Sequence, residues 1–182
     1  MKRSGLLFSV LFLCFVTWMQ AQTAAPRPGP EIEKLRVLGG HWTYEGVDEP
    51  VPFDPGHKVK GTYDAHSILG GFFLQEEENE RELRNLGIES YSPANKNFES
   101  RWYQPDGTTS NGTLTISGHI ITYAGTFYAD GKSYQFREPW VCSADFTNCP
   151  AKAEIPADGK TWVPWFEVTF VKARPAAKNA KK

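Results

Sequence analysis

Histidine and cysteine are scarce in this chain of 182 residues, which has four histidines and three cysteines. The histidines His41, His57, His66 and His119 stand in separate segments and form neither an H-x-H nor an H-E-x-x-H pattern. The chain also lacks a G-x-S-x-G elbow, a Cys–His arrangement and a P-loop. Such patterns bring metal ligands, nucleophiles or phosphate-binding groups together. Because the chain lacks them, we assign no metal site and no catalytic residue. An enzymatic function is therefore the less favoured one.

The chain also has no apolar run long enough to cross a bilayer, which takes roughly 20 residues. Its longest run, Leu6 to Val16, has eleven residues, with Lys2 and Arg3 before it and Ala21 after it. This order is typical of a secretory signal, with retention as an uncleaved anchor as the alternative. We therefore predict a signal peptide over residues 1–21 and an extended linker over 22–30. The cleaved protein would be periplasmic or extracellular, with no stable membrane insertion.

Positive charge is scarce in the body of the protein. The formal net charge is −1, and five basic residues gather without an acidic one at the C-terminal end: Lys172, Arg174, Lys178, Lys181 and Lys182. The rest of the chain is therefore acidic, which argues against a nucleic-acid-binding face. We expect residues 175–182 to form a basic disordered tail. We make no prediction of the oligomeric state.

Two cysteines remain after the predicted signal, Cys142 and Cys149, seven positions apart. In an oxidising compartment such a pair most simply closes one local disulfide loop. A zinc site is disfavoured, because neither a C-x-x-C pattern nor a nearby histidine supplies two further ligands.

One short helical pattern precedes a long series of strand patterns. Ile32, Leu35 and Leu38 lie at helical spacing within residues 31–38, and Gly39-Gly40 ends the helix. Turn residues then separate ten strand-like segments, which together indicate a single antiparallel sandwich or barrel over residues 31–174. The segments are 41–47, 58–63, 68–77, 86–92, 98–104, 112–117, 119–124, 126–129, 133–141 and 162–173.

Alternation along these segments predicts which side chains point inward. Charged residues alternate with Phe98 and Trp102, and polar residues alternate with Phe166 and Phe170. Aromatic residues make up 14% of the chain, enough to fill a wide interior or to line a pocket within it. We predict a ligand-binding set with these members: Trp42, Tyr44, Phe72, Phe98, Trp102, Glu138, Phe166 and Phe170.

Two groups of motifs resemble known families. Gly40-His41-Trp42 after a short helix resembles the G-x-W of lipocalin-like (calycin) barrels, in which a basic residue of the last strand, here Lys172 or Arg174, covers the tryptophan. The order ILGGFFLQEE, GIESYSP and FESRWYQPDG resembles the bacterial domain-of-unknown-function 1579 family over most of residues 31–174. Ser92 replaces the aspartate usual in that family, and residues 143–160 look like an insert.

The resemblance implies an all-β fold: an antiparallel up-and-down calycin-like barrel of about 8–10 strands with a short N-terminal helix. It implies no activity. Related barrels, the nitrobindins, bind haem through a histidine on a late strand. Because no histidine follows His119, we expect no cofactor.

Two carboxylate features carry alternative interpretations. The run Glu76, Glu77, Glu78, Glu80 and Glu82 lacks the spacing and central glycine of a calcium loop, so we interpret it as a solvated strand end. Glu138 shares a face with Phe136 and is expected to point inward, as a salt-bridge partner of Arg137, Arg101 or Lys60 or as a ligand contact.

We therefore favour an exported barrel that binds a small apolar or amphipathic ligand in an aromatic-lined cavity. One alternative is an isomerase or hydrolase at the barrel mouth that uses Glu138, Tyr91 or His119. Another is a structural envelope protein with no cavity.

Overall fold

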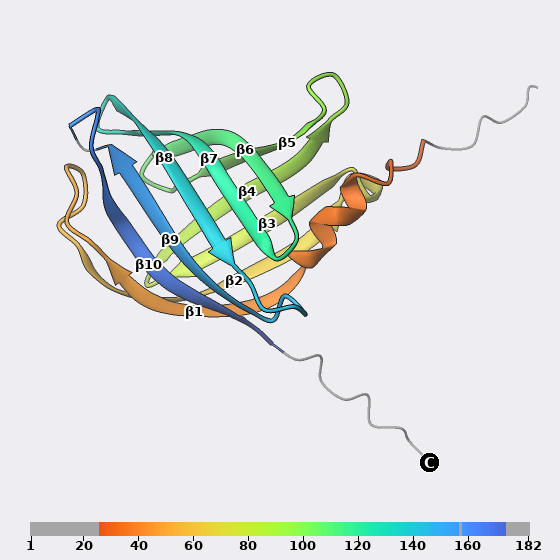
Figure 1. Ribbon diagram of the computed structural model, residues 1–182, viewed down its shortest axis with the longest axis horizontal. Helices are drawn as coiled ribbons and strands as arrows, with labels where there is room; N and C mark the ends of the chain where they lie inside the picture. The colour runs from red at the N-terminus through yellow and green to blue at the C-terminus, as the bar shows by residue number, and fades with distance from the viewer. Residues whose placement is uncertain (1–25, 157, 174–182) are drawn as a thin grey trace, which may run out of the picture.

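The computed structural model describes residues 26–156 and 158–173, which form one closed barrel of ten antiparallel strands (Figure 1). Each strand pairs with its sequence neighbours, and the first strand closes the barrel against the last. The predicted all-β, up-and-down barrel is confirmed. The predicted signal peptide and C-terminal tail lie outside the described residues. The strands are β1 Gly40–Asp48, β2 His57–Ile68, β3 Phe73–Glu80, β4 Leu83–Ser92, β5 Asn97–Tyr103, β6 Thr109–Ser117, β7 Ile120–Ala129, β8 Lys132–Val141, β9 Asn148–Pro156 and β10 Trp162–Lys172.

The structure differs from the sequence prediction at several elements. The N-terminal helix is the short 3-10 helix η1, Ile32–Val37. The predicted strand over 68–77 is interrupted by the 3-10 turn η2, Leu69–Gly71, because Gly70 and Gly71 have φ values of 71° and 91°. The two strands predicted over 119–124 and 126–129 are one strand, β7. Its Gly125 permits close approach to β6, since a Cβ there would lie 2.5 Å from the Cα of Gly112.

Strand β9 was missed because its composition is poor in strand-forming residues. Its inward side chains include Cys149, Ala151 and Ala153, which are small, and Pro150 stands between them. The segment taken for an insert therefore supplies one wall of the barrel. The predicted disulfide between Cys142 and Cys149 is formed and joins the start of β9 to the end of β8.

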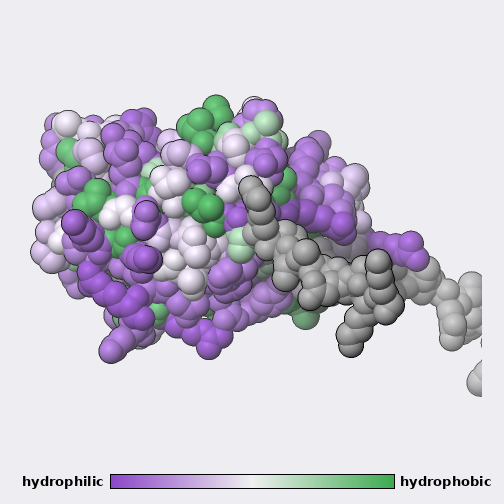
Figure 2. All heavy atoms as spheres, turned by 90° about the horizontal axis from the view of Figure 1, so that it is seen from below, coloured by the Kyte–Doolittle hydropathy of each residue, from purple (hydrophilic) through white to green (hydrophobic). Residues whose placement is uncertain are grey.

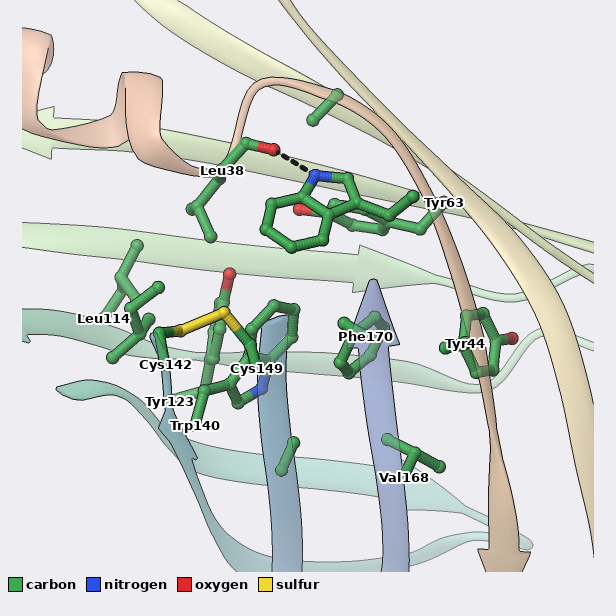
Figure 3. Packing of buried hydrophobic residues seen from close by; sticks show 14 of the residues in the cluster. Leu38, Tyr44, Tyr63, Leu114, Tyr123, Trp140, Cys142, Cys149, Val168 and Phe170 are labelled. Atoms are coloured by element: carbon green, nitrogen blue, oxygen red, sulfur yellow. Dashed lines mark hydrogen bonds between the residues drawn. A yellow bond between two sulfur atoms is a disulfide. The ribbon is translucent and has the colours of Figure 1, made fainter. Parts of the chain in front are cut away.

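One end of the barrel is closed by η1 and by the segment that holds the disulfide. The indole Nε1 of Trp42 donates a 2.8 Å hydrogen bond to the carbonyl of Leu38, drawn as a dashed line in Figure 3. The Nζ of Lys172 lies 4.7 Å from the centre of the Trp42 ring system and donates a 2.9 Å hydrogen bond to the carbonyl of Val37. Lys172 therefore holds the position predicted for the covering basic residue. The disulfide packs beside Leu114 and Trp140 at this end (Figure 3).

One face of the outer surface is mostly hydrophilic. On the face turned downward in Figure 1, green hydrophobic residues are scattered among purple ones (Figure 2). No described helix is long and apolar enough to span a membrane.

Candidate functional site

The barrel contains a cavity of about 360 Å³ that opens at the end opposite η1. Its mouth includes residues from four turns: Asp54 from β1–β2, Arg81 from β3–β4, Asp106 from β5–β6 and Asp130 from β7–β8. The alternation of the strands places every second side chain in the interior, so the cavity wall is built from nearly the whole length of the chain. A cavity of this size falls within the range that holds small-molecule ligands.

Aromatic rings form much of the cavity wall. Trp140 and Phe170 stack with ring centroids 4.0 Å apart and an interplanar angle of 13°, and the Tyr44 ring lies 5.1 Å from Phe170. Figure 3 shows Tyr44, Phe170 and Trp140 following one another across the interior. Towards the mouth, Phe53 lies 5.5 Å from Trp165. The wall therefore offers both ring faces and ring edges to a ligand.

A bulge in β10 adds an aromatic side chain that alternation does not predict. The register of β10 against β9 shifts between Pro164 and Phe166. Neighbouring residues of a regular strand point to opposite faces, but Trp165 and Phe166 both line the cavity here. Sequence alternation found Phe166 and missed Trp165.

The predicted ligand-binding residues divide into two groups. Tyr44, Trp102, Glu138, Phe166 and Phe170 line the cavity. The other three lie elsewhere: Trp42 in the closed end, Phe98 against the ring of Tyr91 at 5.5 Å, and Phe72 directly after η2.

The interior also holds carboxyl groups that the sequence analysis placed in solvent. Glu76 is 0% exposed, and Glu78 lines the cavity, so the interpretation of the acidic run as solvated is wrong for both. The physical reason is the strand period: Glu76 and Glu78 share a face with the buried Leu74, whereas Glu77 faces outward and pairs with Arg84.

Each interior carboxyl group has a neutral hydrogen-bond donor. The hydroxyl of Tyr63 donates to Glu76, and the Ser100 hydroxyl donates to Glu89 at 2.8 Å. The Asn85 amide donates to Glu78 at 2.9 Å. Glu89, which is 0% exposed, was not predicted as a site residue.

Glu138 lies on β8 and faces the cavity. Its Oε1 accepts a 2.7 Å hydrogen bond from the indole Nε1 of Trp140. The salt bridges expected from the sequence do not form: Arg137 pairs with Glu154 at 2.7 Å, and Arg101 lies 3.9 Å from Glu99. Lys60 is exposed and makes no salt bridge with Glu138. Glu138 is therefore an interior acid without a cationic partner among the described residues.

The buried surroundings raise the pKa values of the interior carboxyl groups, so these groups stay protonated to a higher pH than in water. Burial raises the pKa of Glu138 to about 8. Burial also raises the pKa of Glu76 and Glu78, and burial together with the nearby Glu76 raises the pKa of Glu89. A protonated carboxyl group can both donate and accept a hydrogen bond.

Several buried polar atoms in this interior have no hydrogen-bond partner among the described residues. They include the hydroxyls of Tyr44 and Tyr123, the Oε2 atoms of Glu76 and Glu89 and the Oδ1 of Asn85. Tyr44 and Tyr123 are each 4% exposed, and both line the cavity. An unpaired buried hydroxyl costs free energy, so a ligand that bonds to it gains affinity.

At the mouth, His57 lies among three carboxylates. Its Nε2 is 2.9 Å from Glu80 and 3.8 Å from Asp48, and its Nδ1 is 3.5 Å from Asp54. The hydrogen bond to Glu80 raises the pKa of His57, and burial followed by the charge of Glu80 raises the pKa of Asp48 to about 7. Ligand atoms of Asp48, Asp54 and His57 lie within 4.8 Å of one another, a spacing that could hold a divalent cation.

The residues considered for a barrel-mouth enzyme are not brought together. Glu138 lines the cavity, but Tyr91 packs on Phe98. His119 is exposed in the turn after β6, with its ring 5.8 Å from that of Phe146. Acid–base catalysis requires its groups within hydrogen-bond reach of one substrate, and these three residues do not meet that condition.

Comparisons with known proteins agree with this architecture. The model of a protein family described as "Protein of unknown function (DUF1579)" matches residues 27–171. The crystal structure of Rv2717c from M. tuberculosis superposes with a TM-score of 0.60, covering 81% of this chain and 99% of that chain. The two chains are 14% identical, so this similarity shows the fold alone. No curated protein matches the chain.

Proposed function

The chain belongs to the DUF1579 family of proteins of unknown function, and we propose that its barrel is an exported binding module for a small amphipathic molecule. The observation that carries the proposal is the open cavity of about 360 Å³ with aromatic walls and unpaired hydroxyl groups. The aromatic walls suit the apolar part of a ligand, and the hydroxyl and carboxyl groups suit its polar part.

Two features of the barrel favour binding over a purely structural role. A structural barrel gains stability when side chains fill its interior, since a cavity forfeits packing contacts. Here the interior remains open although tryptophan and phenylalanine surround it. Buried acids without cationic partners also cost stability, which is typical of groups retained for a site.

The exported location rests on two observations. The N-terminal residues have the order of a secretory signal. The Cys142–Cys149 disulfide is of the kind that persists in an oxidising compartment.

Binding can be tested with N-phenyl-1-naphthylamine, a neutral dye whose fluorescence increases in apolar surroundings. We expect saturable binding of one dye per barrel, with quenching of tryptophan fluorescence because Trp102, Trp140 and Trp165 line the cavity. Ser110→Phe on β6 adds a ring to the cavity wall and should weaken binding at least tenfold. The matched control is Asn111→Phe, because Asn111 is the next residue and is exposed.

Both variants should retain the far-UV circular dichroism of the wild type. Dye binding that is absent from the wild type, or equal in Ser110→Phe and the wild type, would show that the cavity is not a binding site.

A further inference from the structure

We infer that the ligand of this cavity is a cationic amphiphile, whose ammonium group binds at Glu138 beside the rings of Tyr123 and Trp140. The inference rests on the proposed function and adds the chemical class of the ligand to it. It follows from the charges around the cavity, from the rings beside Glu138 and from the unpaired hydroxyl groups.

The ionisable groups that line the cavity are predominantly acidic. Glu78 and Glu138 lie within it, and the basic residues of its lining are Arg81 and His57, both near the mouth. Neither Glu78 nor Glu138 forms a salt bridge among the described residues. Their hydrogen-bond donors are neutral: the Asn85 amide for Glu78 and the Trp140 indole for Glu138. The mouth adds five carboxyl groups: Asp48, Asp54, Glu80, Asp106 and Asp130. Walls of one charge sign in a cleft of low dielectric concentrate ligands of the opposite sign.

The surroundings of Glu138 suit an ammonium group in particular. Glu138 lies directly opposite Tyr123 in the pairing of β8 with β7, and the Tyr123 ring is 5.7 Å from that of Trp140. Trp140 in turn stacks on Phe170. That stacking covers one face of each ring, so Tyr123 and the remaining face of Trp140 are the aromatic surfaces nearest Glu138. An organic cation is attracted to such ring faces, so rings and carboxylate act on it together.

The unpaired polar atoms favour a ligand that carries a hydrogen-bonding group. The Tyr123 hydroxyl is buried, lines the cavity and has no hydrogen-bond partner among the described residues. It could accept a hydrogen bond from a primary ammonium group. An anionic headgroup would instead stand beside Glu138 and Glu78 with no interior cation to balance it.

Protonation gives the site a measurable signature. The titratable groups that face Glu138 are Tyr123 on β7 and Glu76 and Glu78 on β3. Because the pKa of Glu138 is about 8, this group is mostly protonated at pH 7 in the empty barrel. A cation favours the ionised carboxylate, so its binding should release a proton, whereas binding of a neutral ligand should not.

The test compares ligands that share an eight-carbon chain: octyltrimethylammonium, octylammonium, octanol and octanoate, each displacing N-phenyl-1-naphthylamine. We expect both ammonium ions to bind at least tenfold more tightly than octanol, and octanoate to bind most weakly. Calorimetry at pH 7 in buffers of different ionisation enthalpy should show release of roughly 0.5–1 proton with octyltrimethylammonium and none with octanol.

Glu138→Gln keeps an acceptor for the Trp140 indole and removes the charge. It should reduce octyltrimethylammonium affinity at least tenfold and abolish proton release. Glu167→Gln is the matched control, because Glu167 lies outward on β10 with 68% of its side chain exposed.

The outcomes separate the two proposals. If octanol and the dye bind but the ammonium ions bind no more tightly than octanol, the cationic ligand class is wrong and the binding module stands. Preferential binding of octanoate overturns the inference in the same way. If neither the dye nor any member of the series binds, the proposed function itself fails.

Discussion

Trp140 and Glu138 lie two residues apart on β8 and are joined by a 2.7 Å hydrogen bond from the indole Nε1 to the carboxyl Oε1. Residues two apart on a strand share a face, so both side chains point into the barrel. The bond fixes the Glu138 carboxyl against the aromatic wall with no cationic residue beside it. The pH dependence of stability and the ligand preference both follow from this arrangement.

The empty barrel should lose stability as the pH rises from 5 to 8. The pKa of Glu138 is about 8 in the folded protein and about 4.5 in the unfolded chain, so between these values the folded state binds more protons. The stabilisation by the proton is complete below the unfolded pKa and is lost as the pH rises through the folded pKa. Urea denaturation at several pH values measures this loss.

Glu138→Gln should remove much of that pH dependence. A neutral amide carries no ionisation cost, so the variant should match the wild type near pH 5 and exceed its free energy of unfolding by about 3 kcal/mol at pH 8. Glu76, Glu78 and Glu89 retain part of the slope, because burial raises the pKa of each. An unchanged slope in Glu138→Gln would mean that Glu138 ionises freely in the folded barrel.

Lys172→Met should destabilise the barrel by about 1–3 kcal/mol. The substitution keeps most of the aliphatic stem but removes the cation over Trp42 and the hydrogen bond to Val37. Lys152→Met is the control, since Lys152 is half exposed and lies 3.9 Å from the exposed Glu167, a surface pair of little energetic value. Chemical denaturation at pH 7 distinguishes the two. Equal effects would show that Lys172 does not seal the closed end.

Reduction of the Cys142–Cys149 disulfide should lower the free energy of unfolding by about 2–3 kcal/mol, because the bond closes a short loop in the unfolded chain. Thermal unfolding with and without tris(2-carboxyethyl)phosphine measures the change. A Cys142→Ala, Cys149→Ala double variant should be destabilised by a similar amount and should not respond to the reductant. If the reductant does not change the thermal unfolding of the wild type either, the prediction is contradicted.

The sequence predicts the barrel well because a strand with one buried face has apolar and polar residues that alternate with a period of two. It does not predict how far along the barrel axis a side chain lies, because that depends on the stagger of neighbouring strands. Trp42 and Tyr44 illustrate the limit: they share a face of β1, yet Trp42 seals the closed end and Tyr44 lines the cavity.

The interior acids were missed for a different reason. A run of glutamates is usually solvated, whereas the alternation of β3 places Glu76 and Glu78 on the same face as Leu74. The signal was present in the pattern of β3. Glu89 on β4 follows the same rule, since it shares a face with Gly87, where a Cβ would lie 2.7 Å from the ring of Trp102.

The most direct test of the central claim is to follow the indole N–H resonances of Trp140 and Trp42 by NMR while N-phenyl-1-naphthylamine is added. Trp140 lines the cavity, and Trp42 lies in the closed end with its N–H bonded to Leu38. Binding in the cavity predicts a saturable shift of the Trp140 resonance and little change at Trp42. A shift confined to Trp42, or no saturable shift at either indole, would contradict it.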